Sequence, residues 1–175
     1  MASSSSSSKA TTSAEISEEK KMLTLISSDG DKFELEQSIA IQSLTIKNMV
    51  EDDYTTIPLP NVDTETLTKV IDYMKMHAVE KTEMNQEELK KFDELFAKGS
   101  FDEVYEVILA ANYLDIKSMM DLLCQSIADR IKNKSVNAVR KIFNVDNDYT
   151  PEEEEEVKKE HAWAHEGVEF DDSLE

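Results

Sequence analysis

The chain has 175 residues, 39% of them hydrophobic, which suits one compact domain with tails. Its formal net charge of -19 disfavours nucleic acid and anionic membranes as partners, because both bind proteins through an excess of lysine and arginine. Cys124 is the only cysteine, so no internal disulfide can form and no thiol cluster can hold zinc or iron, and we expect a reducing compartment. The serine run at residues 3–8 stands where a secretory signal would need an apolar stretch, and no window approaches the roughly 20 apolar residues of a membrane span. We therefore expect an intracellular, soluble protein.

The start of the chain predicts a tail followed by a hairpin. Residues 1–20 are serine-rich and then charged, with too few large apolar groups to offset the entropy of ordering them. An apolar run at 22–26, turn residues at 27–30, and the alternation of Phe33 and Leu35 with charged residues then predict a β-hairpin.

Two short helices and an edge strand are expected next. Residues 38–42 and 43–50 have helical patterns, with Leu44 and Ile46 among the side chains that we expect to be buried. Residues 57–60, Ile-Pro-Leu-Pro, must be extended, because proline cannot donate to a strand ladder and restricts the residue before it. A short edge strand suits both constraints.

Three amphipathic helices should then form most of the core. Asp63 can cap the first, whose apolar residues recur at i, i+3, i+4 and i+7. Residues 102–114 are apolar around much of their circumference and predict a central helix, and residues 119–132 align a further apolar face. Between these helices, residues 78–91 are polar and predict a linker, with one turn of helix anchored by apolar residues of the segment 92–96.

The last quarter combines a clear helix start with little apolar surface. Thr150 can cap a helix, Pro151 fits its first position, and Glu153 can return the hydrogen bond of the cap. This helix offers only Val157, Trp163 and alanines for burial, whereas most helical stability in water comes from tertiary packing. From the proline onward the chain carries 11 acidic residues against two lysines. Such a segment is expected to finish folding against a partner, so binding is favoured over catalysis.

These elements predict an α+β protein, with a small N-terminal sheet covered by helices and an all-helical C-terminal section. Five separated blocks resemble, in order, the adaptor subunit of SCF ubiquitin ligases, the S-phase-kinase-associated protein family, and the serine-rich start is similar to plant paralogues. The blocks are Ser27–Gly30, Thr45–Met49, Pro58–Val62, Val107–Ile116 and Asn147–Val157.

The resemblance implies a domain organisation. It covers about residues 22–166 and implies a BTB/POZ fold over residues 21–131, then C-terminal F-box-binding helices over 132–166 and an acidic tail over 167–175. By the same resemblance the chain is a non-enzymatic adaptor without a cofactor. It would bridge a cullin to F-box proteins in the nucleus and cytoplasm, so that substrates are brought to the ubiquitin-charged enzyme.

The resemblance also implies two sets of binding residues. Those matching the cullin contacts of the family are Ile46, Lys47, Asn112 and Tyr113. Those matching the F-box groove are Cys124, Ile127, Ile131, Phe143, Val145, Asn147, Tyr149 and Trp163. An apolar groove with one tryptophan suits a helical, apolar F-box, because aromatic anchors usually dominate such interfaces.

The chain departs from the family pattern mainly on the F-box side. Where the family usually has Gly-Lys-Thr-Pro-Glu-Glu-Ile-Arg, residues 133–140 are Asn-Lys-Ser-Val-Asn-Ala-Val-Arg, so the short helix that Ser135 can cap loses a proline and two acidic residues from its first turn. Phe92 stands where a tryptophan is expected. The usual Glu-Asn-Gln-Trp-Ala-Phe-Glu ending is Glu-His-Ala-Trp-Ala-His-Glu at residues 160–166, and an acidic extension follows. We therefore expect an intact cullin contact and a narrower or altered F-box repertoire.

Other functions are open at this stage. A BTB module could self-associate or serve another assembly. His161 and His165 lie four apart on an expected helix and could hold a metal ion, but a third ligand is not evident, and exposed polar residues are the better interpretation. The calcium-loop resemblance of residues 146–150 fails because its glycine and final glutamate are misplaced, and no nucleophile motif supports a hydrolase.

Overall fold

The computed structural model describes residues 21–78, 86–164 and 170–173. Strands β1 (Met22–Ile26) and β2 (Lys32–Glu36) form the expected antiparallel hairpin, in which Gly30 adopts a φ of +90° that favours glycine. Strand β3 (Thr56–Pro58) pairs in parallel with β1, giving the order β2-β1-β3. The predicted proline-containing strand therefore lies at an edge, where its missing donors are tolerated.

Helices α1 (Gln37–Ala40), α2 (Leu44–Glu51) and α3 (Thr64–Ala78) complete the N-terminal part. The side chain of Asp63 accepts a hydrogen bond of 2.7 Å from the backbone of Thr66, as its predicted capping role requires. The prediction that Leu44 is buried is wrong. Leu44 is the first residue of α2, and its side chain remains nearly half exposed.

Helix α4 (Gln86–Phe96) corrects the predicted linker. The second half of the segment predicted as polar linker is helical, and its rings pack on α3: Phe92 stacks on Phe96 at 5.7 Å between centroids, and Phe96 meets Tyr73 at 5.3 Å. The polarity that suggested a linker belongs to the solvent face of a helix whose other face is aromatic. Residues 79–85 lie outside the described part of the chain.

Helices α5 (Phe101–Tyr113) and α6 (Lys117–Ile131) link the two ends of the molecule. Helix α5 packs on α3 and on α6, which agrees with its predicted central position. The core is formed by side chains from the sheet, from helices α1 to α6 and from the segments between them. Its largest fully buried members are Leu23, Leu25, Leu35, Ile46, Ile57, Leu59, Leu67, Tyr73, Met74, Leu114, Ile116 and Met119.

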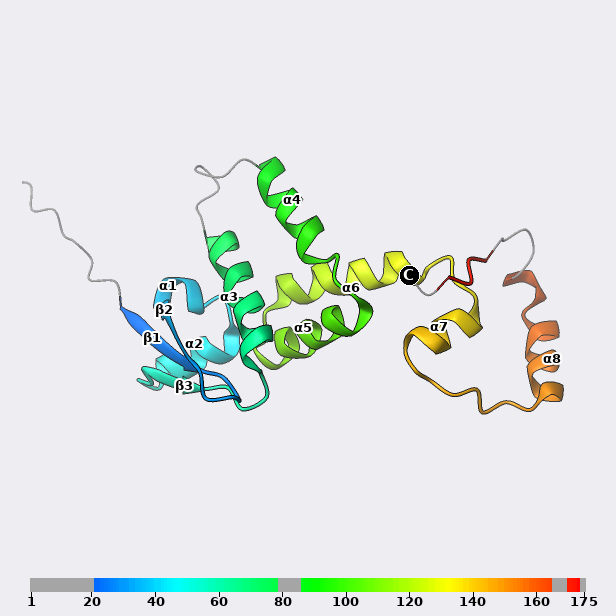
Figure 1. The fold of residues 1–175 in the computed structure, drawn as a ribbon, viewed down its shortest axis with the longest axis horizontal. Helices are drawn as coiled ribbons and strands as arrows, with labels where there is room; N and C mark the ends of the chain where they lie inside the picture. The colour runs from blue at the N-terminus through cyan, green and yellow to red at the C-terminus, as the bar shows by residue number, and fades with distance from the viewer. Residues whose placement is uncertain (1–20, 79–85, 165–169, 174–175) are drawn as a thin grey trace, which may run out of the picture.

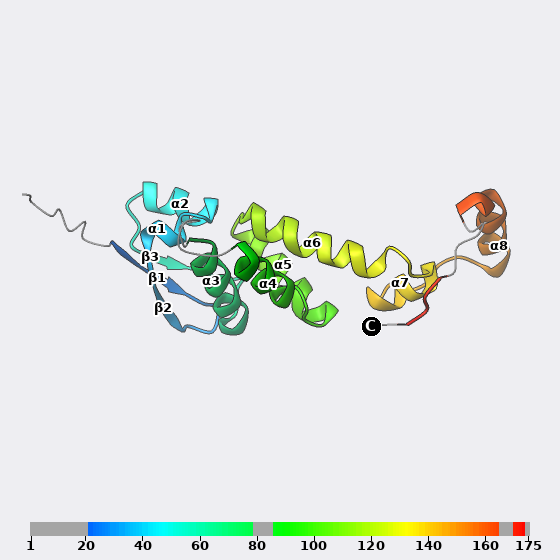
Figure 2. The same cartoon turned by 90° about the horizontal axis from the view of Figure 1, so that it is seen from above.

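Helices α7 (Val136–Ile142) and α8 (Pro151–Glu160), followed by the single-turn 3-10 helix η1 (Ala162–Ala164), form the C-terminal part. Figures 1 and 2 show that both α7 and α8 lie beyond the end of α6, away from the sheet. Among the described residues of these elements, only Ala138 is a buried hydrophobic residue. We call β1 to α6 the body and α7 to η1 the C-terminal arm.

Candidate functional site

The predicted cullin-binding residues lie where α2 meets the end of α5. The backbone N–H groups of Leu44 and Thr45 point at the carbonyls of Asp115 and Leu114, each at 3.4 Å, and the Thr45 hydroxyl donates to the Tyr113 carbonyl at 3.0 Å. Unpaired donors at the start of α2 thus meet unpaired acceptors at the end of α5, which joins the two helix ends.

This junction orders the exposed residues of the surface. The hydroxyl of Ser43 donates to the Leu114 carbonyl and accepts from the Ile46 backbone, so one buried serine caps α2 and fastens it to α5. Lys47 and Asn112 are exposed on adjoining helices, while Tyr113 is partly buried. We call these three residues the α2–α5 surface.

Ile46 does not belong to that surface. Its side chain is 0% exposed and lies in the core, so it cannot contact a partner in this conformation. The residue matches the expected position in sequence, but it points into the core while Lys47, one residue further along the helix, points outward. Its contribution is to fix α2 against the body.

Four of the predicted F-box-binding residues come together in one apolar groove. Cys124, Ile127 and Ile131 recur along α6, and Phe143 follows the end of α7 across from them. The groove has a volume of about 510 Å³ and is lined mostly by apolar atoms. We call it the first groove.

Helix α5 supplies the other wall, which sequence reasoning did not assign to the site. Phe101, Tyr105 and Ile108 line the first groove, and the Phe101 ring meets that of Phe143 edge-on at 6.4 Å. The guanidinium of Arg130 lies over the Phe101 ring, 3.9 Å from its centroid, and donates to the Gly99 carbonyl at 2.9 Å. The sequence contained part of the signal for this wall. Tyr105 belongs to a second apolar stripe of α5, a helix whose first apolar stripe is already buried in the core.

Val145 and Asn147 lie in the exposed segment that joins α7 to α8 and do not line the first groove. The Asn147 side chain accepts a hydrogen bond of 3.2 Å from the Tyr149 backbone, which shapes this segment. Val145 is more than half exposed.

Tyr149 lines a different hollow, of about 530 Å³, between α7 and α8. Val136, Val157, His161 and Phe170 line it as well, and we call it the second groove. The predicted F-box-binding residues therefore do not form one groove: four line the first groove, and Tyr149 alone lines the second. Trp163 lines neither groove, and its side chain is 75% exposed on η1.

The start of α8 has the predicted chemistry. Thr150 accepts a 3.3 Å hydrogen bond from the backbone of Glu153, whose carboxylate accepts from the Thr150 backbone at 2.9 Å, completing the capping box. The hydrogen bonds from the Thr150 backbone and hydroxyl lower the pKa of Glu153 below its usual value. The capping box defines the start of α8, but the helix has no buried face: Val157, its apolar residue, is 37% exposed.

The described residues contain no group of three or more histidine, cysteine or acidic side chains arranged to hold a metal ion. His161 is exposed, and His165, its suggested partner, lies outside the described residues. Within the same part of the chain, no helix is both long and apolar enough to cross a bilayer.

Comparisons with known proteins agree on one family. A model described as the Skp1 family tetramerisation domain matches residues 21–79, and one described as the Skp1 family dimerisation domain matches residues 117–164. The chain is 51% identical to SKP1-like protein 11 and 52% identical to SKP1-like protein 12, both from Arabidopsis thaliana, over 149 residues that cover 83% of this chain and 98% of each relative. It is also 45% identical to SKP1-like protein 1 of Oryza sativa subsp. japonica over 168 residues, which cover 85% of this chain and 97% of the relative.

Proposed function

We propose, from the premise that this chain belongs to the Skp1 family, that its α2–α5 surface binds a cullin and its C-terminal arm binds F-box proteins. As a member of that family, the chain is an adaptor subunit of an SCF ubiquitin ligase, and it acts in ubiquitin-dependent protein degradation. Skp1 family adaptors are non-catalytic, and we extend that description to this chain. The chain then acts by positioning the F-box protein relative to the cullin.

The observation that carries the F-box half of the proposal is apolar surface that the chain itself leaves open. Side chains of α5, α6 and the end of α7 form an apolar groove, and Phe143 and Tyr105 on its walls are about half exposed. A helical partner with an apolar face would bury this surface, at about 25 cal/mol for each Å² removed from water. Val145, Tyr149 and Trp163 continue the exposed apolar surface along the arm.

The cullin half rests on position and rigidity. Lys47 and Asn112 are exposed on two helices that are tied together by backbone and serine hydrogen bonds, so a partner meets a surface that needs little ordering. The α2–α5 surface belongs to the body, whereas both grooves involve the arm or the end of α6 beside it. Two partners could therefore bind at once, as an adaptor requires.

A reconstitution tests the proposal directly. The full chain is mixed with a purified cullin N-terminal domain, with a purified F-box domain, and with both, and the complexes are measured by light scattering after gel filtration. We expect both binary complexes and a ternary complex with one copy of each protein. Binding to neither partner would refute the proposal.

The departures at residues 133–140 and 160–166 support a narrower or altered F-box repertoire, because Ser135, Val136 and Asn137 of the first segment and His161 of the second line the second groove. Affinity purification from cells with this chain and with a typical family member compares the two sets of F-box proteins, and equal sets would reject this refinement. We also propose that the chain acts in the nucleus and cytoplasm, which imaging of a fluorescent fusion checks.

A self-associating BTB module is the second candidate. Its support is the BTB-type body with an exposed edge strand, β3. Analytical ultracentrifugation of the chain with and without an F-box peptide separates the two, because self-association predicts a dimer that the peptide leaves unchanged.

A further inference from the structure

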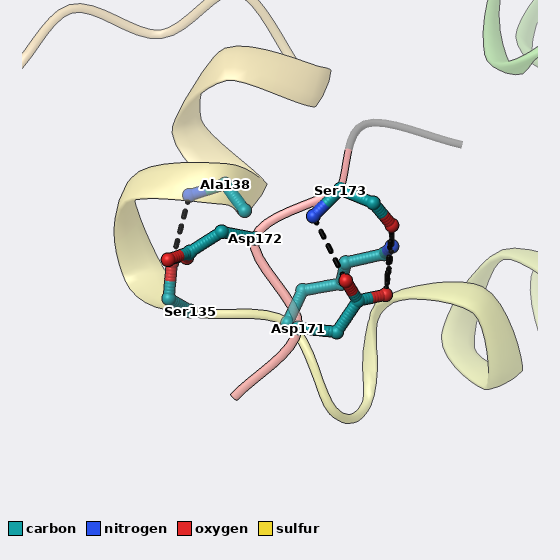
Figure 3. Close-up of polar contacts among 6 residues, drawn as sticks. Ser135, Ala138, Asp171, Asp172 and Ser173 are labelled. Carbon is teal, nitrogen blue, oxygen red and sulfur yellow. Dashed lines mark hydrogen bonds and ion pairs between the residues drawn. The ribbon is translucent and has the colours of Figure 1, made fainter. Parts of the chain in front are cut away.

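The C-terminal segment 170–173 returns to the junction between α6 and α7 (Figure 3). The Asp171 backbone donates to the Asn133 carbonyl at 2.9 Å, and residues 134 and 171 form a parallel β-bridge. These residues lie 37 positions apart along the chain, so the contact is tertiary and not part of a local turn. The segment also lies outside the two ranges that match the Skp1 family.

A buried lysine holds the segment. The side chain of Lys134 is only 4% exposed, and its ammonium group donates to the carboxylate of Asp171 and to the hydroxyl of Ser173, each at 2.7 Å. A buried ammonium is costly without hydrogen-bond acceptors, so these contacts favour the docked segment. Ser173 in turn donates to Asp171 at 2.8 Å, which closes a small network.

The cap of α7 makes a further contact. The hydroxyl of Ser135 donates to the carboxylate of Asp172 while it accepts from the backbone of Ala138 at 3.2 Å (Figure 3). The two acidic residues that the family usually has in this first turn are replaced here by Asn137 and Ala138. Without those like charges, Asp172 meets no repulsion from the turn that it approaches. The altered turn and the acidic extension, which seemed unrelated in the sequence, are in contact.

Phe170 gives the segment an apolar anchor. Its side chain lines the second groove together with Tyr149 of the connecting segment and Val157 of α8. Tyr149 is one of the residues assigned to F-box binding. A partner side chain that packed against Tyr149 in this groove would therefore meet Phe170 on the same surface.

We propose that the C-terminal segment 170–173 is an internal competitor: docked, it places Phe170 in the wall of the second groove, and it must leave before an F-box helix packs against Tyr149 there. This inference rests on the proposed F-box binding of the arm. Binding is then weakened by the fraction of molecules whose segment is docked, and F-box proteins that bind chiefly through the first groove escape the competition. Competition by the docked segment would be a physical cause of the narrower F-box repertoire that we propose.

The test compares the full-length chain with the double variant Phe170→Ala, Asp171→Asn, which removes both the apolar anchor and the charge that meets Lys134. Asp72→Asn on α3 is the control, because it makes the same charge change on an exposed site of the body. Isothermal titration with a purified F-box domain measures affinity, and hydrogen exchange measures protection of the Asp171 amide. We expect the double variant to lose that protection and to bind about 10-fold more tightly, the factor that corresponds to a segment docked in about nine molecules of ten. The control should match the unaltered chain.

Every other result decides against the inference. Unchanged affinity after loss of protection would mean that the segment does not compete, and weaker binding would mean that it belongs to the F-box interface. An unprotected Asp171 amide in the unaltered chain would show that the segment is not docked. If no form binds the F-box domain, the proposed function fails, and this inference fails with it.

Discussion

The body and the C-terminal arm contain the same kinds of helices but are stabilised in different ways. The body buries a core of leucines, isoleucines and methionines, whereas the described arm buries one alanine and relies on caps and ion pairs between neighbouring turns. In α8 these pairs are Lys158 with Glu154 at 3.2 Å and Lys159 with Glu155 at 3.0 Å, and exposed pairs of this spacing contribute only about 0.3–0.5 kcal/mol each. The difference shows that one chain can combine a packed body with a helix whose apolar side chains remain exposed for a partner.

Truncation of a buried side chain should show the largest difference between the two regions. Leu67→Ala in the body removes a fully buried side chain and should cost about 2–5 kcal/mol of unfolding free energy. Val157→Ala in α8 is the corresponding truncation in the arm and should cost less than about 1 kcal/mol, because the side chain is smaller and is already partly in water. Urea denaturation followed by circular dichroism measures both. Equal costs would mean that the arm is packed as tightly as the body.

Substitutions at the proposed partner surfaces should separate the two binding activities. The double change Asn112→Ala, Tyr113→Ala should abolish detectable cullin binding, and Phe143→Ala should weaken F-box binding about 30-fold, the effect of a typical interface anchor. Each variant should keep its other partner, because Asn112 and Tyr113 lie at the C-terminal end of α5, whereas Phe143 lies in the arm at the end of α7. Binding is measured by isothermal titration with each partner. Loss of both activities in the first variant would indicate damage to the fold, since Tyr113 is partly buried.

Two capping boxes of the same type offer a smaller and sharper comparison. Ser100 and Glu103 start α5 in the body, and Thr150 and Glu153 start α8 in the arm. Replacing either cap residue with alanine should cost about 1 kcal/mol. In Ser100→Ala this cost should appear in global unfolding, whereas in Thr150→Ala it should appear only as faster hydrogen exchange in α8, because little of the core depends on that helix. A fall in global stability with Thr150→Ala would contradict the division into body and arm.

The smallest expected effect concerns the titration of Asp171. Hydrogen bonds from Lys134 and then from Ser173 lower the pKa of its carboxyl from 3.8 to about 2. A lowered pKa means that the contact contributes fully above pH 3.8 and is lost as the pH falls through about 2. Replacing the lysine, as in Lys134→Met, should return the pKa of Asp171 toward 3.8, which carboxyl carbon NMR can follow.

Much of the fold could be predicted from local patterns. The hairpin and the caps at Asp63 and Thr150 depend on residues close together in the chain, and the prolines of residues 57–60 favour an extended backbone locally. The structure confirms the hairpin, the edge strand and both caps. The linker prediction failed at Gln86–Phe96 because the polarity of an exposed face outweighed the few aromatic residues that anchor the helix. The candidate site was predicted less completely, since a residue such as Ile46 can match a family position and still point inward.

The sequence by itself determined where capped helices such as α3 and α8 start, which family the chain resembles, and that its acidic end offers few apolar residues for burial. Only the tertiary structure decided that Phe101 and Tyr105 face Cys124 across a groove, and that Asp171 reaches Lys134. The reason is physical: a cap is made between residues three apart, whose geometry the backbone fixes, while a groove or a docked segment depends on how distant elements pack together.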